Sequence, residues 1–191
     1  MVATAVSLSV PSLASLVDLC RREGPIVFDD VCLDLVDDLA TEILMRSRRE
    51  RSIGSKNVGG WKSAESFLDA GPGALFRARI ARDFLAGHAP VGWAMVNRAG
   101  SEHLRHAHGL ARVSGCFYVR AGDPLVPTIF ERVPRPLPGD ASIVRDGEIA
   151  VLPKAGRLVL FPGEMNHRVP RYDGQAPRIT IAVDVARRGG T

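Results

Sequence analysis

The spacing of hydrophobic positions changes near residue 90 and divides the chain into two halves. Before that point, apolar residues recur at helical spacing over residues 29–50 and again over residues 73–88, where Gly87 is expected to end the second helix. The apolar positions are Val31, Leu33, Leu35, Leu39, Ile43 and Leu44 in the first stretch, and Leu75, Ile80, Phe84 and Leu85 in the second. We also expect a strand and a helix near the N-terminus.

After Pro90 the pattern becomes typical of β-strands, with short runs rich in β-branched and aromatic residues between glycines and prolines. The predicted strands lie within residues 91–98, 111–120, 125–133, 148–153, 157–162 and 177–186. So many short strands predict an antiparallel barrel or sandwich, with the helices of the first half packed on its outside. We therefore expect a mainly β fold with supporting α-helices in one domain, in which residues 1–90 are mainly helical support with an N-terminal strand and residues 91–191 form the β-barrel core.

Composition fits a globular domain of 191 residues, with 46% hydrophobic and 24% charged residues. The apolar N-terminal stretch has no basic leader, is broken by Pro11 and runs into charged residues, so neither an export signal nor a membrane span is expected. Three cysteines without CxxC spacing favour a reducing, cytoplasmic setting. The net charge is +4, and its one focus, residues 45–52, is expected to be the solvated end of a helix rather than a nucleic-acid patch.

Three of the five histidines lie within six residues, at His103, His106 and His108. Alternate residues of a strand share a face, so His106 and His108 are expected to point together, and His103 away from them unless a bulge intervenes. His167 follows a predicted strand and is the expected third ligand, because three ligands on one side of a metal leave positions open for a substrate. From this spacing alone, a metal site and a chance cluster of surface histidines both stay open.

The last predicted strand has two different faces. Ile179, Ile181, Val183 and Val185 form an aliphatic face, whereas Arg178, Thr180, Ala182 and Asp184 form the other. If the aliphatic face packs against the helices, the arginine points into the barrel, where it needs an anion. A guanidinium and a nearby hydroxyl suit a carboxylate ligand. The alternative is an internal salt bridge, for example to Asp184.

Five segments, in order, resemble one branch of the Fe(II)/2-oxoglutarate-dependent oxygenases, a branch of small bacterial and phage proteins. They are SKNVGGWKS (residues 55–63), GWAMVNRAGSEHLRHAH (92–108), VSGCFYV (113–119), GRLVLFPGEMNHRV (156–169) and RITIAV (178–183). The resemblance implies a double-stranded β-helix fold of the jelly-roll or cupin-like type. It also implies an oxygenase that uses Fe(II), 2-oxoglutarate and O2 to hydroxylate a substrate, with release of succinate and CO2.

The resemblance also implies roles for individual residues. His106, His108 and His167 would hold the iron, and Arg178 with Thr180 would bind the distal carboxylate of 2-oxoglutarate. Tyr118 and Asn97 have the strand parity of inward-facing residues and are candidates for further co-substrate contacts; the alternative is that each is a hydrogen-bonded core residue. No catalytic residue beyond the metal ligands is expected.

The chain departs from the family pattern at two positions. Most members have His-x-Asp or His-x-Glu where this chain has His-x-His, so His108 is either a ligand that adds no negative charge or a neighbour of the metal. In the second case a carboxylate such as Glu102 or Asp123 replaces it, or the position stays open, as in halogenases. The branch usually has asparagine at the position of Met95.

Trp61, Trp93 and Met95 are expected to shape a substrate pocket, and the proline-rich segment 122–142 is either a lid over it or an exposed connection. A small-molecule substrate is expected, with no nucleic-acid or membrane partner. The sequence leaves open its identity, the oligomeric state, and hydroxylation against halogenation or desaturation. Two other classes also stay open: a cupin-like three-histidine enzyme without 2-oxoglutarate, such as a thiol dioxygenase, and a non-catalytic ligand-binding barrel.

Overall fold

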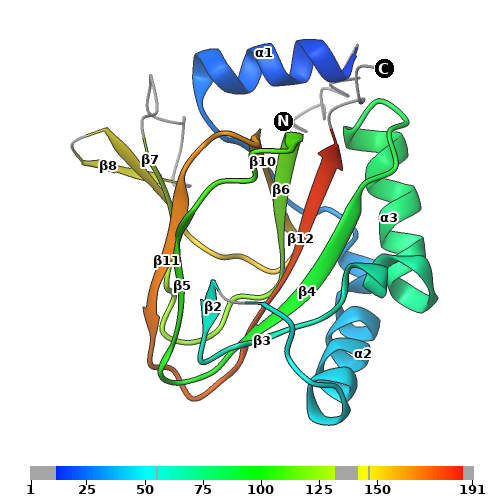
Figure 1. Cartoon of the computed structure of the whole chain (residues 1–191), viewed down its shortest axis with the longest axis vertical. Coiled ribbons are helices and arrows are strands. Elements are labelled where there is room, and N and C mark those ends of the chain that lie inside the picture. The colour runs from blue at the N-terminus through cyan, green and yellow to red at the C-terminus, as the bar shows by residue number, and fades with distance from the viewer. Residues whose placement is uncertain (1–11, 55, 132–141, 146, 187–191) are drawn as a thin grey trace, which may run out of the picture.

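Two six-stranded antiparallel sheets face each other in the computed structural model of the chain, and helices cover the outside of one sheet (Figure 1). The structure describes residues 12–54, 56–131, 142–145 and 147–186. Its helical segments are α1 (Leu13–Glu23), η1 (Leu33–Leu35), α2 (Val36–Arg49), η2 (Glu65–Asp69) and α3 (Gly71–Phe84). Both predicted helices of the first half are therefore confirmed, although the first begins only at α2, after a short 3-10 turn.

The sheet under the helices, called sheet A, has the strand order β1-β10-β6-β12-β4-β3. Its strands, in that order, are Ile26–Phe28, Arg157–Pro162, Ala111–Arg120, Arg178–Ala186, Val91–Asn97 and Trp61–Lys62. Sheet B has the order β2-β5-β11-β7-β9-β8. Its strands, in that order, are Asn57–Val58, Ser101–His106, His167–Tyr172, Thr128–Glu131, Glu148–Val151 and Ser142–Arg145.

The mainly β fold with supporting helices is thus confirmed, and each of the six predicted strand regions contains a strand. In the described part of the chain neither sheet closes on itself, so the two form a sandwich of open sheets rather than a continuous barrel. The short strands β2 and β3 were not predicted, because two-residue strands carry no alternating pattern long enough to detect.

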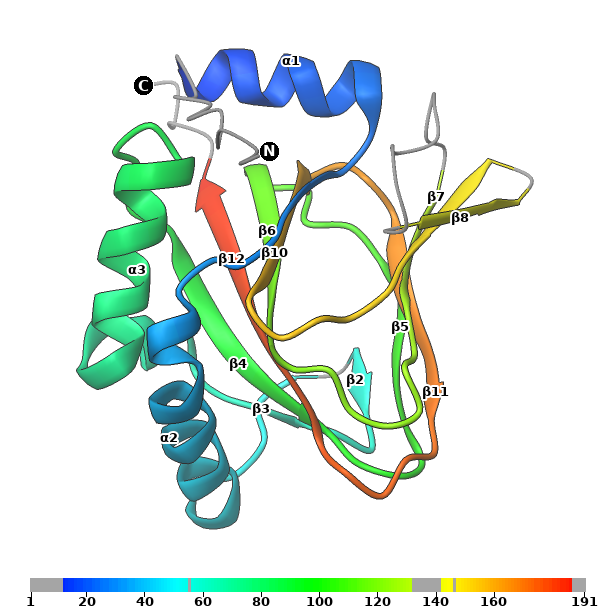
Figure 2. The ribbon, with the colours of Figure 1, turned by 180° about the vertical axis from the view of Figure 1, so that it is seen from behind.

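The two faces of β12 separate the interior into two parts. Its aliphatic side chains lie in the core between sheet A and the helices, together with Leu39 and Ile43 of α2 and Phe76 and Ile80 of α3. Each of these four helix residues is fully buried, which contributes about 1.5–3 kcal/mol per side chain. The view from behind shows α2 and α3 along this outer face and α1 across the top of the molecule, above the strand ends (Figure 2). The other face of β12 therefore points into the space between the sheets, as predicted.

The pairing of β3 with β4 sends two adjacent side chains to opposite faces of sheet A. Trp61 lies opposite Val96 and joins the core under the helices, where its indole N–H donates to the Glu50 carbonyl at 3.0 Å. The prediction that Trp61 shapes the substrate pocket is therefore wrong. Lys62 lies opposite Met95 and shares its inward face.

The basic residues near position 48 form the last turn of α2, as expected for cations at a helix C-terminus. Within the described part of the chain, no helix is long and apolar enough to cross a membrane.

Candidate metal and co-substrate site

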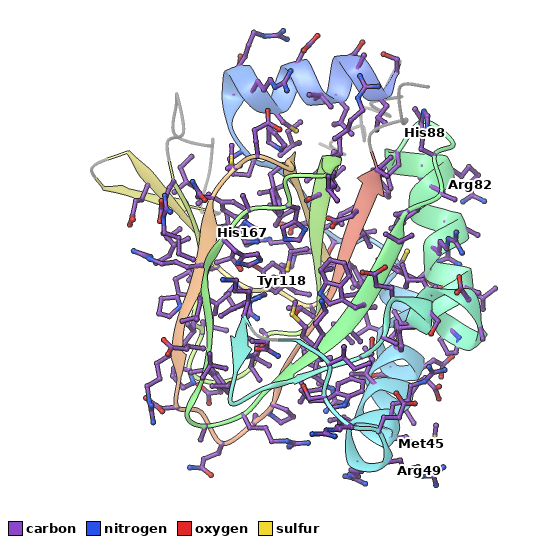
Figure 3. The ribbon with its side chains drawn as sticks, in the orientation of Figure 1. Met45, Arg49, Arg82, His88, Tyr118 and His167 are labelled. Carbon is purple, nitrogen blue, oxygen red and sulfur yellow. The ribbon has the colours of Figure 1, made fainter. Side chains whose placement is uncertain are left out.

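Three of the predicted ligands come together between the sheets. His106 ends β5, His108 follows two residues later, and His167 begins β11 directly opposite His106. One ligand atom of each lies within 4.8 Å of those of the other two. Figure 3 shows His167 in the space between the sheets, whereas His88 lies far away beyond the end of α3.

The Nδ1 atom of each of the three clustered histidines is held by a hydrogen bond. His106 Nδ1 lies 2.7 Å from the Leu104 carbonyl, and His167 Nδ1 lies 3.2 Å from the Met165 carbonyl. A carbonyl oxygen only accepts, so both rings carry their proton on Nδ1 and keep the lone pair on Nε2. Burial lowers the pKa of both imidazoles, that of His167 to about 3, which keeps them neutral and able to bind a metal.

His108 is held by a carboxylate instead. Its Nδ1 lies 2.7 and 2.8 Å from the two oxygens of Asp184, and the Ser114 hydroxyl donates to the same carboxylate at 2.7 Å. The backbone N–H of His108 donates to Gly163, where a Cβ would come within 2.6 Å of the His108 carbonyl oxygen. A side chain at position 163 would therefore displace this ligand.

The geometry of these rings fits a bound cation. His106 Nε2 and His108 Nε2 lie 3.2 Å apart. When each of these two rings carries its single proton on Nδ1, the two Nε2 lone pairs face each other. Facing lone pairs repel each other, and a metal ion bound between these two atoms and His167 would remove the repulsion by accepting the lone pairs. Glu102 and Asp123 do not belong to this cluster in the part of the chain that the structure describes.

Arg178 lies at the inner end of the site, and no carboxylate of the described residues pairs with it. The side chain is fully buried, its Nη2 donates to Thr128 Oγ1 at 3.1 Å, and its guanidinium lies 5.2 Å from the centre of the Tyr118 ring. Its Nε and the Thr180 hydroxyl are buried and have no hydrogen-bond partner among the residues that the structure describes. Since Asp184 pairs with His108, the alternative of an Arg178–Asp184 salt bridge is wrong. A buried cation and an unsatisfied hydroxyl fit a ligand carboxylate.

Two adjacent cavities, which share four lining residues, surround these groups. The inner cavity contains the three ligand histidines together with Arg178 and Thr180. The outer cavity, of about 390 Å³, opens from it and also contains Lys62 and Asp184. Trp93, His103, His106 and His108 line both. Trp93 and Met95 therefore line the interior, as predicted.

His103 lies on the same side as His106, not on the opposite one. His167 and Val169 of β11 pair with His106 and His103, so three steps along β5 correspond to two along β11. This bulge inverts the strand parity, and the two β5 imidazole centres lie 4.3 Å apart. Burial, followed by the neighbouring histidines and Arg178, lowers the pKa of His103 to about 2. The site thus has a fourth, neutral imidazole.

The remaining predicted residues differ in position. The hydroxyls of Tyr118 and Thr128 share a hydrogen bond of 2.6 Å, which places Tyr118 beneath Arg178. Asn97 is buried and donates to Asn57 Oδ1 at 2.9 Å, a link between the two sheets. It lines neither cavity, and its predicted contact with the co-substrate stays a prediction.

In the proposed lid, Thr128–Glu131 form β7, and residues 132–141 lie outside the described residues. Sequence reasoning did not find Thr128 or the role of Asp184. Asp184 had the inward parity that could have drawn attention to it, but its pairing with a residue 76 positions away carries no local signal.

Comparison with known proteins identifies the family. The family model described as "Putative 2OG-Fe(II) oxygenase" matches residues 92–184, the span from β4 to β12 that carries all three ligand histidines and Arg178. Over this span, the chain matches the Fe(II)/2-oxoglutarate-dependent oxygenase family. No curated protein matches it.

Solved structures of oxygenases share the fold. A Pseudomonas putida prolyl-4-hydroxylase matches with a TM-score of 0.62 at 22% identity, over 93% of this chain and 100% of that one. The epimerase SnoN from nogalamycin biosynthesis, in complex with Fe3+, alpha ketoglutarate and nogalamycin RO, matches with a TM-score of 0.67 at 16% identity, over 90% of this chain and 82% of that one. HygX from Streptomyces hygroscopicus, with nickel and 2-oxoglutarate bound, matches with a TM-score of 0.59 at 13% identity, over 87% and 84%. These similarities establish the double-stranded β-helix fold that the sequence predicted.

Proposed function

We propose that this oxygenase binds Fe(II) through His106, His108 and His167 and uses 2-oxoglutarate and O2 to hydroxylate a small-molecule substrate. The observation that carries the proposal is the buried Arg178, which has no carboxylate partner among the described residues and lines the cavity that contains the three histidines. A three-histidine site explains the metal, but only an anionic co-substrate explains the arginine.

The protein fixes the ligands before the metal arrives. Hydrogen bonds from the three Nδ1 atoms to Leu104, Met165 and Asp184 set the tautomers and orient the Nε2 atoms. Phe130 and Phe161 pack on His167 and exclude water from that side. When bound, iron supplies the redox chemistry by which O2 oxidises 2-oxoglutarate to succinate and CO2 and hydroxylates a substrate C–H bond.

Arg178 and Thr180 would bind the distal carboxylate of 2-oxoglutarate through the two polar groups that lack partners. Thr128 and Tyr118 hold the guanidinium from the other side, so little side-chain freedom is lost on binding. The inward face of β12 places these two residues on the same strand as Asp184, which sets the co-substrate end and the metal end on one rigid element.

An anaerobic titration tests the proposal. Fe(II)-loaded protein is titrated with 2-oxoglutarate while the weak visible charge-transfer band of the complex is recorded. We expect the band in the wild type and its loss at equal concentrations in Arg178→Ala. The exposed Arg171, which pairs with Asp173, gives the matched control Arg171→Ala, whose band should be unchanged.

The two alternative functions give different results. A three-histidine enzyme that does not use 2-oxoglutarate would bind Fe(II) without developing the band. A non-catalytic barrel would bind neither metal nor co-substrate at physiological concentrations. An undiminished band in Arg178→Ala would refute the assigned carboxylate site. A cytoplasmic location belongs to the proposal and rests on the three cysteines, all of which are free.

A further inference from the structure

The outer cavity contains a lysine, Lys62, that has no role in the proposed binding of the metal or of 2-oxoglutarate. Lys62 lines this cavity, is partly buried and makes no ion pair with any carboxylate of the described residues. Its Nζ lies 4.0 Å from the centre of the Trp93 ring, a cation–π contact that satisfies the ammonium only in part. Burial is the main cause that lowers the Lys62 pKa, so the surroundings destabilise the charged form of the ammonium.

The backbone holds Lys62 in this position. Its N–H donates to Ser52 Oγ at 3.0 Å, and its carbonyl accepts from Ile53 at 2.9 Å. A Cβ at Gly54 would come within 2.9 Å of the Lys62 Cδ, so the aliphatic part of the side chain lies directly against that glycine. These contacts direct the ammonium into the cavity rather than into solvent.

Trp93 joins this charge to the metal site. The same indole stacks on His108, with ring centres 5.7 Å apart and an interplanar angle of 18°. Three histidine ligands would also bring no negative charge to the metal, unlike the usual two-histidine, one-carboxylate set. Asp184 is the one acidic residue that lines the outer cavity within the described chain. Its carboxylate already accepts hydrogen bonds from His108 and Ser114.

We propose that the outer cavity binds an anionic group of the substrate, with Lys62 as its anchor and Trp93 as the adjoining wall. The substrate would then be a small acid, a carboxylate or a phosphate ester. The assignment as a substrate subsite rests on the proposed function, whereas the anion site itself does not. Lys56 also lines the cavity at its exposed rim and adds to the positive potential that draws an anion in.

The test compares acids with a neutral analogue of similar shape. Zn(II)- and 2-oxoglutarate-loaded protein, which does not turn over, is mixed with benzoate, phenyl phosphate or benzamide, and Kd is measured by ligand-detected saturation-transfer NMR. We expect at least one of the two acids to bind about 10-fold or more tightly than benzamide, and the tighter of the two identifies carboxylate or phosphate. In Lys62→Met that acid should fall to the level of benzamide, and Lys62→Arg should retain most of the affinity.

Lys154→Met is the matched control, because it removes one lysine charge outside both cavities, and it should bind the acids as the wild type does. The proposal is overturned if neither acid binds more tightly than benzamide, or if Lys62→Met binds the acids unchanged. Lys62→Arg keeps the proposal falsifiable should the methionine variant fail to fold, since a lost preference for acids in a folded Lys62→Arg protein also contradicts it.

The 2-oxoglutarate band separates this inference from the proposed function. Lys62→Met should keep the band of the Fe(II) protein; if it loses the band, Lys62 binds the co-substrate and the substrate subsite is wrong. If the wild type shows no band but binds benzoate or phenyl phosphate through Lys62, the proposed function fails and the anion site stands.

Discussion

Replacing Asp184 with asparagine should weaken metal binding without unfolding the protein. Both oxygens of Asp184 lie within 2.8 Å of His108 Nδ1, and one also accepts from Ser114. An amide keeps the shape but loses the charge and puts an N–H donor in place of one oxygen. The variant can then favour the tautomer with the proton on Nε2, which removes the lone pair that the metal needs.

The expected loss follows from the number of ligands affected. Asparagine at position 184 disturbs one of three imidazole ligands and leaves the Nδ1 contacts of the other two intact. Loss of such a supporting partner costs about 10- to 100-fold in metal affinity, which corresponds to about 1.4–2.7 kcal/mol. Asp184→Glu should recover part of the affinity, because it restores the charge at a shifted position.

The assay is a competition of Co(II) between the protein and a chromophoric chelator, at fixed pH and ionic strength. The matched control is Asp173→Asn, which removes the same charge at an exposed ion pair with Arg171. The visible spectrum of bound Co(II) reports the ligand field, so it should change in Asp184→Asn and not in the control. A Co(II) affinity within twofold of the wild type, with an unchanged spectrum, would refute the role assigned to Asp184.

Further predictions concern the ligands, the co-substrate and pH. His108→Ala should lose most of its bound Fe(II), measured by metal analysis after desalting, while His88→Ala keeps the wild-type amount; retained iron in His108→Ala would show that it is not a ligand. Arg178→Gln should raise the 2-oxoglutarate Kd by about 30-fold or more, as expected when one partner of a buried charge pair is removed. Calorimetry on the Zn(II) protein measures this Kd, and an unchanged value would contradict the prediction. Thr180→Val should raise that Kd by about 10-fold, the effect of one hydrogen bond to a charged group; equal Kd values would exclude the contact. Burial lowers the pKa of His167 to about 3, whereas the same side chain in the unfolded protein has the ordinary histidine pKa of about 6.5. The unfolded state therefore binds a proton first as the pH falls below about 6.5, and the metal-free protein should lose stability from that pH downward. The fall in Tm between pH 7 and 4 should be smaller in His167→Gln, and identical profiles in variant and wild type would contradict this.

The sequence predicted those parts of the fold that depend on local pattern. The aliphatic alternation of β12 identified both of its faces, and the helical spacing identified α2 and α3. The same alternation correctly sent Arg178 and Thr180 into the interior. These successes share one cause, because burial on one side of a regular element imposes a period that can be read from a single segment.

The incorrect predictions come from irregular backbone and distant pairing. The bulge in β5 placed His103 beside His106, and no residue type marks a bulge at that position. Trp61 was expected in the pocket, but the register of β3 against β4 decides its face, and a two-residue strand does not reveal its register. The partner of Asp184 is likewise set by tertiary structure alone.

The central position of β12 has a consequence for how the protein folds. Without this strand, sheet A consists of two separate pieces, β1-β10-β6 and β4-β3 (Figure 1). Docking β12 closes a long loop, since Arg178 pairs with Asn97, and contacts of such high sequence separation form slowly. The step that completes the sheet also buries the Arg178 charge, so folding and site formation are a single event. A carboxylate that binds only the completed site should therefore stabilise β12 in its place at the centre of sheet A and slow unfolding.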